Sequence, residues 1–196
     1  GTAEVQAFLE LTQPVTKESQ IFKYQGSDPI LVMHVIDSVV PGTANEFVDK
    51  EFFSKLDITD YKWQRDPQGM PVADSGVDLT SRDMVKIGEM LANKGKWGGT
   101  QLLSEEYLAA AFGPIAKATE DWHPENFYYG YFWYQTSAVL DTKIHDINLT
   151  WGAGGNRIIL VNELDLIVVI TGHDLDDVIF DQVAKYVLPA FSLQAQ

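Results

Sequence analysis

The sequence predicts an α+β fold in which an antiparallel sheet is covered by helices and accompanied by a helical lobe. Helix signals fill the first two thirds of the chain, and strand signals gather in the last third. There, two β-branched apolar runs at residues 157–161 and 166–171 flank the polar turn 162–165, which is typical of a buried antiparallel hairpin. Because both runs are almost wholly apolar, we expect helices on both faces of their sheet. The separation of helices from strands favours α+β over a βαβ repeat.

Length and composition limit the class of protein and its partners. With 196 residues, 45% of them hydrophobic, the chain can bury one core, and we expect a mostly helical lobe with long loops at residues 1–125 and the sheet strands plus a C-terminal helix at residues 126–196. A net charge of -14 argues against nucleic acid and anionic membrane surfaces as partners. No apolar run is long enough to cross a membrane, so we expect no membrane span. The sequence has no cysteine, which excludes disulfides and thiolate chemistry and leaves the redox compartment open.

Two helices are expected at the start of the chain. Apolar spacing predicts a short helix at residues 2–11. A second helix is expected at residues 29–40, with Asp28 as its N-cap and Pro29 at its first helical position. The residues that it should bury are Leu31, Val32, Val35, Ile36 and Val39.

Three further helices have clear start or stop signals. Residues 43–46 form a capping box for a helix that continues to Phe53. After an irregular stretch, an amphipathic helix begins near Thr80 and ends at Gly95. Its expected buried stripe is Met84, Ile87, Met90 and Leu91. Ser104 then caps another helix.

Strands and one terminal helix are expected in the last third. The aromatic run at residues 127–134 predicts a single strand. Residues 152–156, Gly-Ala-Gly-Gly-Asn, form a glycine corner just before the first hairpin strand, and glycine beside a strand marks a place where backbone or ligand comes close. An acidic cluster favours the start of the last helix. It consists of Asp174, Asp176 and Asp177.

Four sequence stretches are each weak signals alone, but their order and spacing along the chain are specific. They are Phe-Lys-Tyr-Gln-Gly-Ser-Asp at 22–28, the amphipathic helix with its following Gly-Lys-Trp-Gly-Gly-Thr-Gln at 75–104, Tyr-Gly-Tyr-Phe-Trp at 129–133, and the glycine corner with its hairpin at 152–172. This series resembles the C-terminal part of the β-lactamase-type serine hydrolases. That family includes class C β-lactamases, low-molecular-weight penicillin-binding proteins and related esterases and amide hydrolases. The resemblance covers most of the chain.

The resemblance implies a two-lobed β-lactamase/transpeptidase-like fold, incomplete in this chain, and acyl transfer through an acyl-serine followed by hydrolysis. Tyr24 would act as general acid and base, and the Gly152 N–H would donate a hydrogen bond to the oxyanion. The expected substrate-binding residues are Gly26, Trp151, Gly154, Gly155 and Asn156. The substrates would be small esters or amides, and no cofactor or metal is expected. Relatives are often exported, so a periplasmic or secreted location is expected rather than a cytoplasmic one.

Plainer interpretations of these residues stay open. Tyr24 could be an interfacial aromatic before a helix. Gly152 could serve a bulge or tight turn, which is compatible with the oxyanion role, and the two later glycines of the corner could permit close packing. Trp151, Trp133 and Tyr131 could line an acyl pocket or could be ordinary core aromatics. The four histidines show no metal-ligand spacing.

The sequence departs from the family pattern in three places. No Ser-x-x-Lys motif occurs, so the chain corresponds to a C-terminal portion, and the N-terminal half of the same protein would supply the nucleophilic serine. Gly26 stands where class C enzymes have asparagine, and Leu149 stands where they have the lysine that holds a substrate carboxylate. These changes favour the esterase-like and amide-hydrolase-like branches over β-lactam hydrolysis and peptidase activity. The alternative is a catalytically inactive relative that serves as a binding or scaffold protein.

Overall fold

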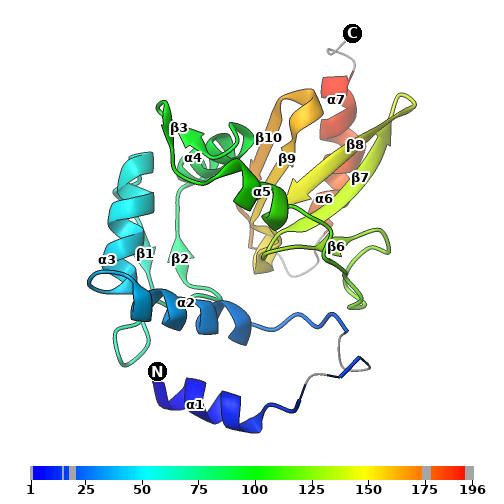
Figure 1. Cartoon of the computed structure of the whole chain (residues 1–196). Helices are drawn as coiled ribbons and strands as arrows, with labels where there is room; N and C mark the ends of the chain where they lie inside the picture. Colours follow the sequence, from blue (N-terminus) through cyan, green and yellow to red (C-terminus); the bar gives the residue numbers. More distant parts are fainter. Residues whose placement is uncertain (1, 15, 18–20, 174–177, 193–196) are drawn as a thin grey trace. The chain divides into compact units, whose positions relative to one another are not determined.

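The computed structural model of the chain describes residues 2–14, 16–17, 21–173 and 178–192. The chain forms two compact units, Gly1–Thr80 and Ser81–Gln196. Figure 1 gives the order of the helices and strands within each unit. The helices α4 (Ser81–Ala92) and α5 (Glu105–Ala111) therefore belong to the same compact unit as the sheet. The two lobes expected from the sequence, which depend on a missing N-terminal half, stay a prediction.

Helices make up most of the first unit. They are α1 (Thr2–Leu11), α2 (Ser27–Val39) and α3 (Ala44–Val48), the last continued by helical turns at Asp49–Phe53 and Ser54–Leu56. The predicted capping box is present: Thr43 Oγ1 accepts from the Glu46 N–H, and the Glu46 carboxylate accepts from the Thr43 N–H at 2.9 Å. A small ladder of β1 (Lys62–Trp63) and β2 (Val77–Asp78) completes the unit. Its core gathers around Phe53, whose ring lies 4.3 Å from Tyr61 and 6.0 Å from Trp63.

The helix α2 differs from its prediction at both its start and its buried face. It begins at Ser27 with Gly26 in the N-cap position, so Asp28 lies in the first turn and is not the cap. Met33 is the buried residue of α2, whereas three residues expected in the core are exposed. These are Val32 at 45%, Val35 at 60% and Val39 at 74% exposure. The helix is apolar on more than one face, and the first unit can cover only one of them.

The second unit is built on a six-stranded antiparallel sheet in the order β10-β9-β8-β7-β6-β5. Its strands are β5 (Ala116–Lys117), β6 (Tyr128–Tyr129), β7 (Tyr134–Leu140), β8 (Lys143–Leu149), β9 (Arg157–Val161) and β10 (Leu166–Ile170). The predicted hairpin is confirmed, with Leu166 opposite Val161 and Ile170 opposite Arg157. Every residue of β9 is buried, as expected of a strand covered on both faces.

Helices cover both faces of this sheet, as the hairpin pattern predicts (Figure 1). On one face, α4 (Ser81–Ala92) packs closely on β9 and β10 because Gly88 has no side chain. A Cβ at Gly88 would lie 2.8 Å from Ile167 Cγ2 and 3.3 Å from Ile158 Cγ2. On the other face lies the C-terminal helical segment, formed by α6 (Ile179–Gln182), a turn at Val183–Val187, and α7 (Leu188–Ser192). Asp174, Asp176 and Asp177, expected at its start, lie outside the described residues.

The sequence between α4 and the sheet behaves as its turn signals predict. The glycine stop at Gly95 has a φ of +82°, a backbone conformation that favours glycine. A tight hairpin of β3 (Lys96–Trp97) and β4 (Thr100–Gln101) follows, and α5 (Glu105–Ala111) begins after the Ser104 cap. The Ser104 hydroxyl accepts from the Tyr107 N–H at 3.1 Å.

The aromatic run at 127–134 is not one strand, which corrects the prediction. The Gly130 N–H donates to Trp133 O at 2.8 Å, and the Phe132 N–H donates to Gly130 O at 3.0 Å, so the chain turns there. Phe132 has a φ of +61° as a result. The turn needs glycine, because a Cβ at Gly130 would lie 2.2 Å from Ala111 O. The long hairpin of β7 and β8 follows and was missed, since its strands mix polar and apolar residues.

Candidate active site

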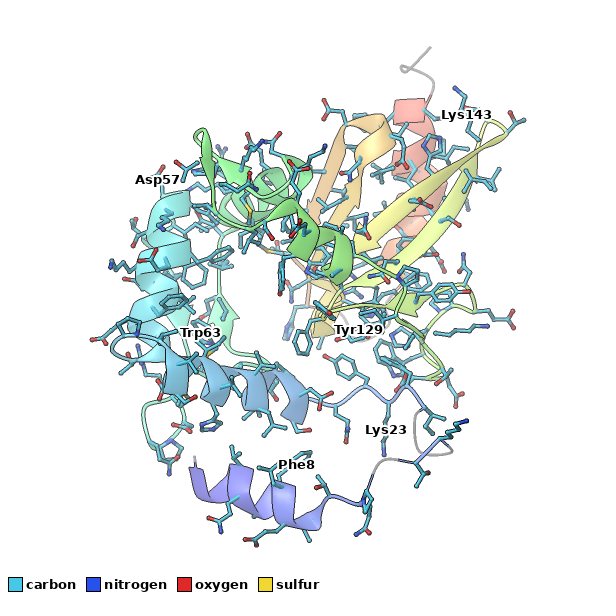
Figure 2. The ribbon with its side chains drawn as sticks, in the orientation of Figure 1. Phe8, Lys23, Asp57, Trp63, Tyr129 and Lys143 are labelled. Atoms are coloured by element: carbon cyan, nitrogen blue, oxygen red, sulfur yellow. The ribbon has the colours of Figure 1, made fainter. Side chains whose placement is uncertain are left out.

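The first part of the predicted site lies in the segment that leads into α2, where Lys23 is labelled in Figure 2. Tyr24 lies three residues before α2 and is 45% exposed, so solvent reaches its side chain. Gly26 has no room for a larger side chain without movement of its neighbour. A Cβ there would lie 3.0 Å from the Oδ2 atom of Asp74. The asparagine that class C enzymes carry at this position would therefore require a small shift of the Asp74 carboxylate.

The second part is the glycine corner, which joins β8 to β9. Gly152 and Asn156 form an antiparallel bridge, in which the Gly152 N–H donates to Asn156 O at 3.0 Å. Gly154 and Gly155 have φ values of +77° and +92°, and both values strongly favour glycine. A Cβ at Gly155 would also lie 2.2 Å from the Cδ1 atom of Ile179. The glycines thus have a conformational role and a packing role, and substrate contact at these positions stays a prediction.

The side chain of Asn156 holds the corner together. Its Nδ2 group donates to Ala153 O at 3.0 Å, and its Oδ1 atom accepts from the Gly172 N–H at 3.3 Å. Gly172 follows β10, so this one amide links the entrance of the hairpin to its exit. Contact between Asn156 and a substrate, as predicted, would have to compete with these two hydrogen bonds.

Arg157 is a site residue that sequence reasoning missed. Its side chain is fully buried, and its Nη1 atom donates to Gly152 O at 2.5 Å and to Asn156 O at 2.9 Å. Its guanidinium carbon lies 4.3 Å from the centre of the Trp151 ring, a cation–π contact. Burial lowers the pKa of Arg157 to about 10, so the group stays charged at neutral pH. The sequence did contain one signal for its role: Arg157 is the only charged residue in the apolar run at 157–161.

Trp151 belongs to an aromatic cluster behind the corner. Its ring centre lies 5.5 Å from that of Phe127 and 6.0 Å from that of Tyr134, which is 1% exposed. Trp133, which could also have lined an acyl pocket, packs edge-on against Phe112 at 5.0 Å. Tyr131 lies 6.1 Å from Tyr107. These contacts support a packing role for all three aromatics, and a pocket-lining role stays a prediction.

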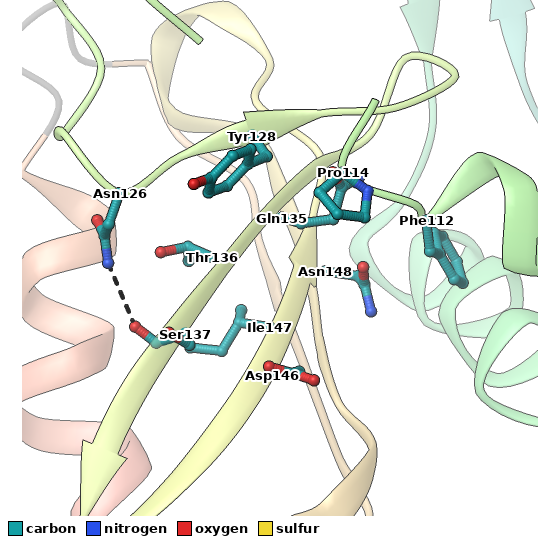
Figure 3. Close-up of a pocket in the computed structure, with 10 residues that line it drawn as sticks. All are labelled: Phe112, Pro114, Asn126, Tyr128, Gln135, Thr136, Ser137, Asp146, Ile147 and Asn148. Carbon is teal, nitrogen blue, oxygen red and sulfur yellow. Dashed lines mark hydrogen bonds between the residues drawn. The ribbon is translucent and has the colours of Figure 1, made fainter. Parts of the chain in front are cut away.

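A separate cavity of about 500 Å³ lies against β7 and β8 in the second unit (Figure 3). Polar side chains from these strands line it together with Phe112, Pro114 and Tyr128. Asn126 spans its rim by donating to Ser137 O at 3.4 Å. Its lining residues include none of the predicted site residues, so it is distinct from the glycine corner. Within the described part of the chain, no group of three or more histidine, aspartate or glutamate side chains could hold a metal ion.

The two parts of the predicted site lie in different compact units. Tyr24 and Gly26 belong to the first unit, and the residues from Trp151 to Asn156 belong to the second. Their convergence on a single cleft stays a prediction.

Comparisons with known proteins give the fold. No protein-family model matches the sequence, and no curated protein matches it significantly. Among solved structures, the chain is similar to a protein described as a 6-aminohexanoate-dimer hydrolase from Bacillus anthracis, with a TM-score of 0.73, 17% identity, and coverage of 97% of this chain and 49% of that one. A penicillin-binding protein homologue from Pyrococcus abyssi, which is octameric, gives a TM-score of 0.73, 18% identity, and coverage of 98% and 47%. A protein described as a β-lactamase from Bacteroides dorei gives a TM-score of 0.64 and 14% identity, with coverage of 90% of this chain and 58% of that one.

These matches confirm the predicted fold: the chain has a β-lactamase/transpeptidase-like fold, with an antiparallel sheet and helices. The chain spans about half the length of the first two structures. Among the described residues, no helix is both long and apolar enough to cross a membrane.

Proposed function

We propose that this chain is the C-terminal portion of a serine hydrolase that acts on small esters or amides through an acyl-serine intermediate. The observation that supports it best is the ordered glycine corner at the entrance to β9, in a chain with this fold. Fold alone does not give function, because one fold serves many chemistries. The roles of individual residues are therefore argued separately.

In the proposed reaction, the nucleophilic serine and its lysine come from the N-terminal half of the same protein. The Tyr24 phenol, together with that lysine, takes the serine proton as the oxygen attacks the acyl carbon. The proton then passes to the departing alcohol or amine, and the same groups activate water for hydrolysis of the acyl-serine. The exposure of Tyr24 is compatible with this role. Backbone N–H groups stabilise the tetrahedral oxyanion, one beside the serine and one at the glycine corner.

The end of β8 bears on the choice of substrate. Leu149, which stands where class C enzymes have lysine, is fully buried at the end of this strand. A leucine there cannot pair with a substrate carboxylate. This supports acyl substrates without a carboxylate at that position, such as simple esters and amides.

The N-terminal half is proposed as a physical partner as well as the source of the serine. The exposed valines of α2 form an apolar face, and β10 stands at one end of the sheet order. An apolar strand at a sheet edge needs a pairing or covering segment. We propose that the N-terminal half covers both.

The alternative is a catalytically inactive relative that binds or scaffolds. The absence of Ser-x-x-Lys from the 196 residues, with Gly26 and Leu149, favours it. Hydrolysis of nitrophenyl acetate and butyrate by the full-length protein separates the two proposals, and labelling by a serine-directed phosphonate identifies the nucleophile.

The decisive variant is Tyr24→Phe. It should lower kcat by about 10²–10⁴-fold, the usual contribution of a general acid–base group. Tyr186→Phe is the matched control, since Tyr186 is also exposed, at 63%, and should keep wild-type activity. Residues 1–196 alone should show no turnover. A full-length protein without turnover or labelling would leave the binding or scaffold proposal, and turnover by residues 1–196 alone would place the nucleophile within this chain.

A further inference from the structure

The hydrogen bonds of the glycine corner decide which of its N–H groups can serve an oxyanion. The Gly152 N–H already donates to Asn156 O at 3.0 Å, in the bridge that closes the corner. An oxyanion that used this N–H would have to break the bridge. The next peptide along the chain, between Gly152 and Ala153, has no such constraint on its N–H.

The orientation of that peptide follows from its carbonyl. Gly152 O accepts from the buried guanidinium of Arg157 at 2.5 Å. The described residues contain no cis peptide bond, and in a trans peptide the N–H points opposite to the C=O. The Ala153 N–H therefore points away from the buried guanidinium. Ala153 is exposed, and no hydrogen bond from its N–H is found among the described residues.

Arg157 also makes this N–H a stronger donor. A hydrogen bond from a charged donor is about twice as strong as a neutral one, and it polarises the peptide that accepts it. Electron density drawn toward Gly152 O leaves more positive charge on the Ala153 hydrogen. The second bond of Nη1, to Asn156 O at 2.9 Å, and the contact with Trp151 at 4.3 Å hold the guanidinium in place.

We propose that the Ala153 N–H, and not the Gly152 N–H, is the oxyanion donor of the corner, and that Arg157 is a positioning residue for it. This inference rests on the proposed serine-hydrolase function and deepens it. The corner then keeps its bridge during the reaction, so the donor is preorganised. Preorganised donors are the ones that contribute most to oxyanion stabilisation.

The backbone allows a direct test, because proline at position 153 removes this one N–H. Gly152 has φ -88° and ψ 140°, the extended region that a residue before proline prefers. Ala153 begins a helical turn, whose φ matches the fixed φ of proline. Ala153→Gly is the matched control, since it changes the side chain and keeps the N–H.

The assay is nitrophenyl ester hydrolysis by the full-length protein. Ala153→Pro should lower kcat by about 10²–10³-fold with little change in KM, the effect of losing one oxyanion donor. The loss of kcat in Ala153→Pro should exceed any loss in Ala153→Gly by about 10²-fold or more, because only the proline removes the N–H, and thermal melts should show that both variants fold. If Ala153→Pro keeps the kcat of Ala153→Gly while the wild type is active, the donor lies elsewhere and this inference fails alone. If the wild type shows no turnover, the proposed function fails and this inference fails with it.

The role of Arg157 has its own readout. Arg157→Met removes the charge and the donor, whereas Arg157→Lys keeps the charge. The methionine variant should lower kcat more than the lysine variant, with KM nearly constant, and should shift the Ala153 amide proton upfield in the NMR spectrum. Equal kcat values for folded wild type and Arg157→Met, with an unmoved amide resonance, would show that Arg157 is structural only.

Discussion

Replacement of Gly155 by alanine tests whether the corner is held by backbone conformation, by packing, or by both. Gly155 has a φ of +92°, and its missing Cβ would lie 2.2 Å from the Cδ1 atom of Ile179. The unfavourable φ costs an alanine about 1–2 kcal/mol, and the overlap with Ile179 adds about 1–3 kcal/mol. We therefore expect Gly155→Ala to lower the free energy of unfolding by about 2–5 kcal/mol.

A second position separates the two causes. Gly154 has a φ of +77°, but its missing Cβ would lie at an ordinary 3.4 Å from the nearest atom, Gly172 O. Gly154→Ala should thus show only the backbone cost, about 1–2 kcal/mol. Urea unfolding of the full-length variants, compared at equal slope, gives both values.

The packing cost can be isolated in a double-mutant cycle with Ile179→Val, which removes Cδ1 alone. Ile179→Val should cost about 0.5–1.5 kcal/mol by itself. In the double variant, the overlap is gone, so the loss should fall short of additivity by about 1–3 kcal/mol. Additive losses, or equal losses for Gly154→Ala and Gly155→Ala, would refute the claim that Ile179 packs against this glycine.

Two other predictions concern stability and assembly. Burial lowers the pKa of His123 from 6.5 to about 4, although the charge of Glu120 acts in the opposite direction. The stability contributed by the neutral, buried imidazole is therefore complete above pH 6.5 and is lost as the pH falls toward 4. In melts at stepped pH, His123→Phe should lose less stability than the wild type across this interval, and an unchanged pH profile would contradict this prediction. Because the valines of α2 are exposed, residues 1–196 alone should be partly unfolded, oligomeric or paired with an upstream fragment. A chain that is strictly monomeric by light scattering and melts cooperatively in calorimetry would count against this.

Local signals carried the correct part of the fold prediction. The capping box at 43–46, the stop at Gly95 and the hairpin from Arg157 to Ile170 each depend on residues a few positions apart, and the structure confirms all three. The prediction for α2 was less accurate. Its exposed valines depend on what packs against the helix, and the spacing of apolar residues within one helix does not contain that information.

The errors in the strands have a similar cause. The aromatic residues before Tyr134 have high strand propensity, yet the backbone turns there because Gly130 fits against Ala111 O. The hairpin of β7 and β8 was missed because it carries polar residues such as Ser137 and Asp146 in its central positions. Its turn residues Asp141 and Thr142 have positive φ values of 47° and 75°, a conformation that their residue types do not strongly signal.

The candidate site was predictable only in part. The glycine corner was predicted from the position of its glycines just before a strand, and Gly154 and Gly155 do adopt positive φ values that favour glycine. The distribution of its hydrogen bonds was not predictable, because the Gly152 bridge and the Arg157 contacts depend on how β8 and β9 meet.

The contacts of Arg157 make the corner depend on one side chain for its charged hydrogen bonds. Both acceptors of Nη1 are main-chain oxygens, which every amino acid supplies, so the guanidinium does not depend on the side chains of Gly152 and Asn156 for its acceptors. Loss of the Arg157 side chain would therefore remove the charged donor from two main-chain oxygens at once.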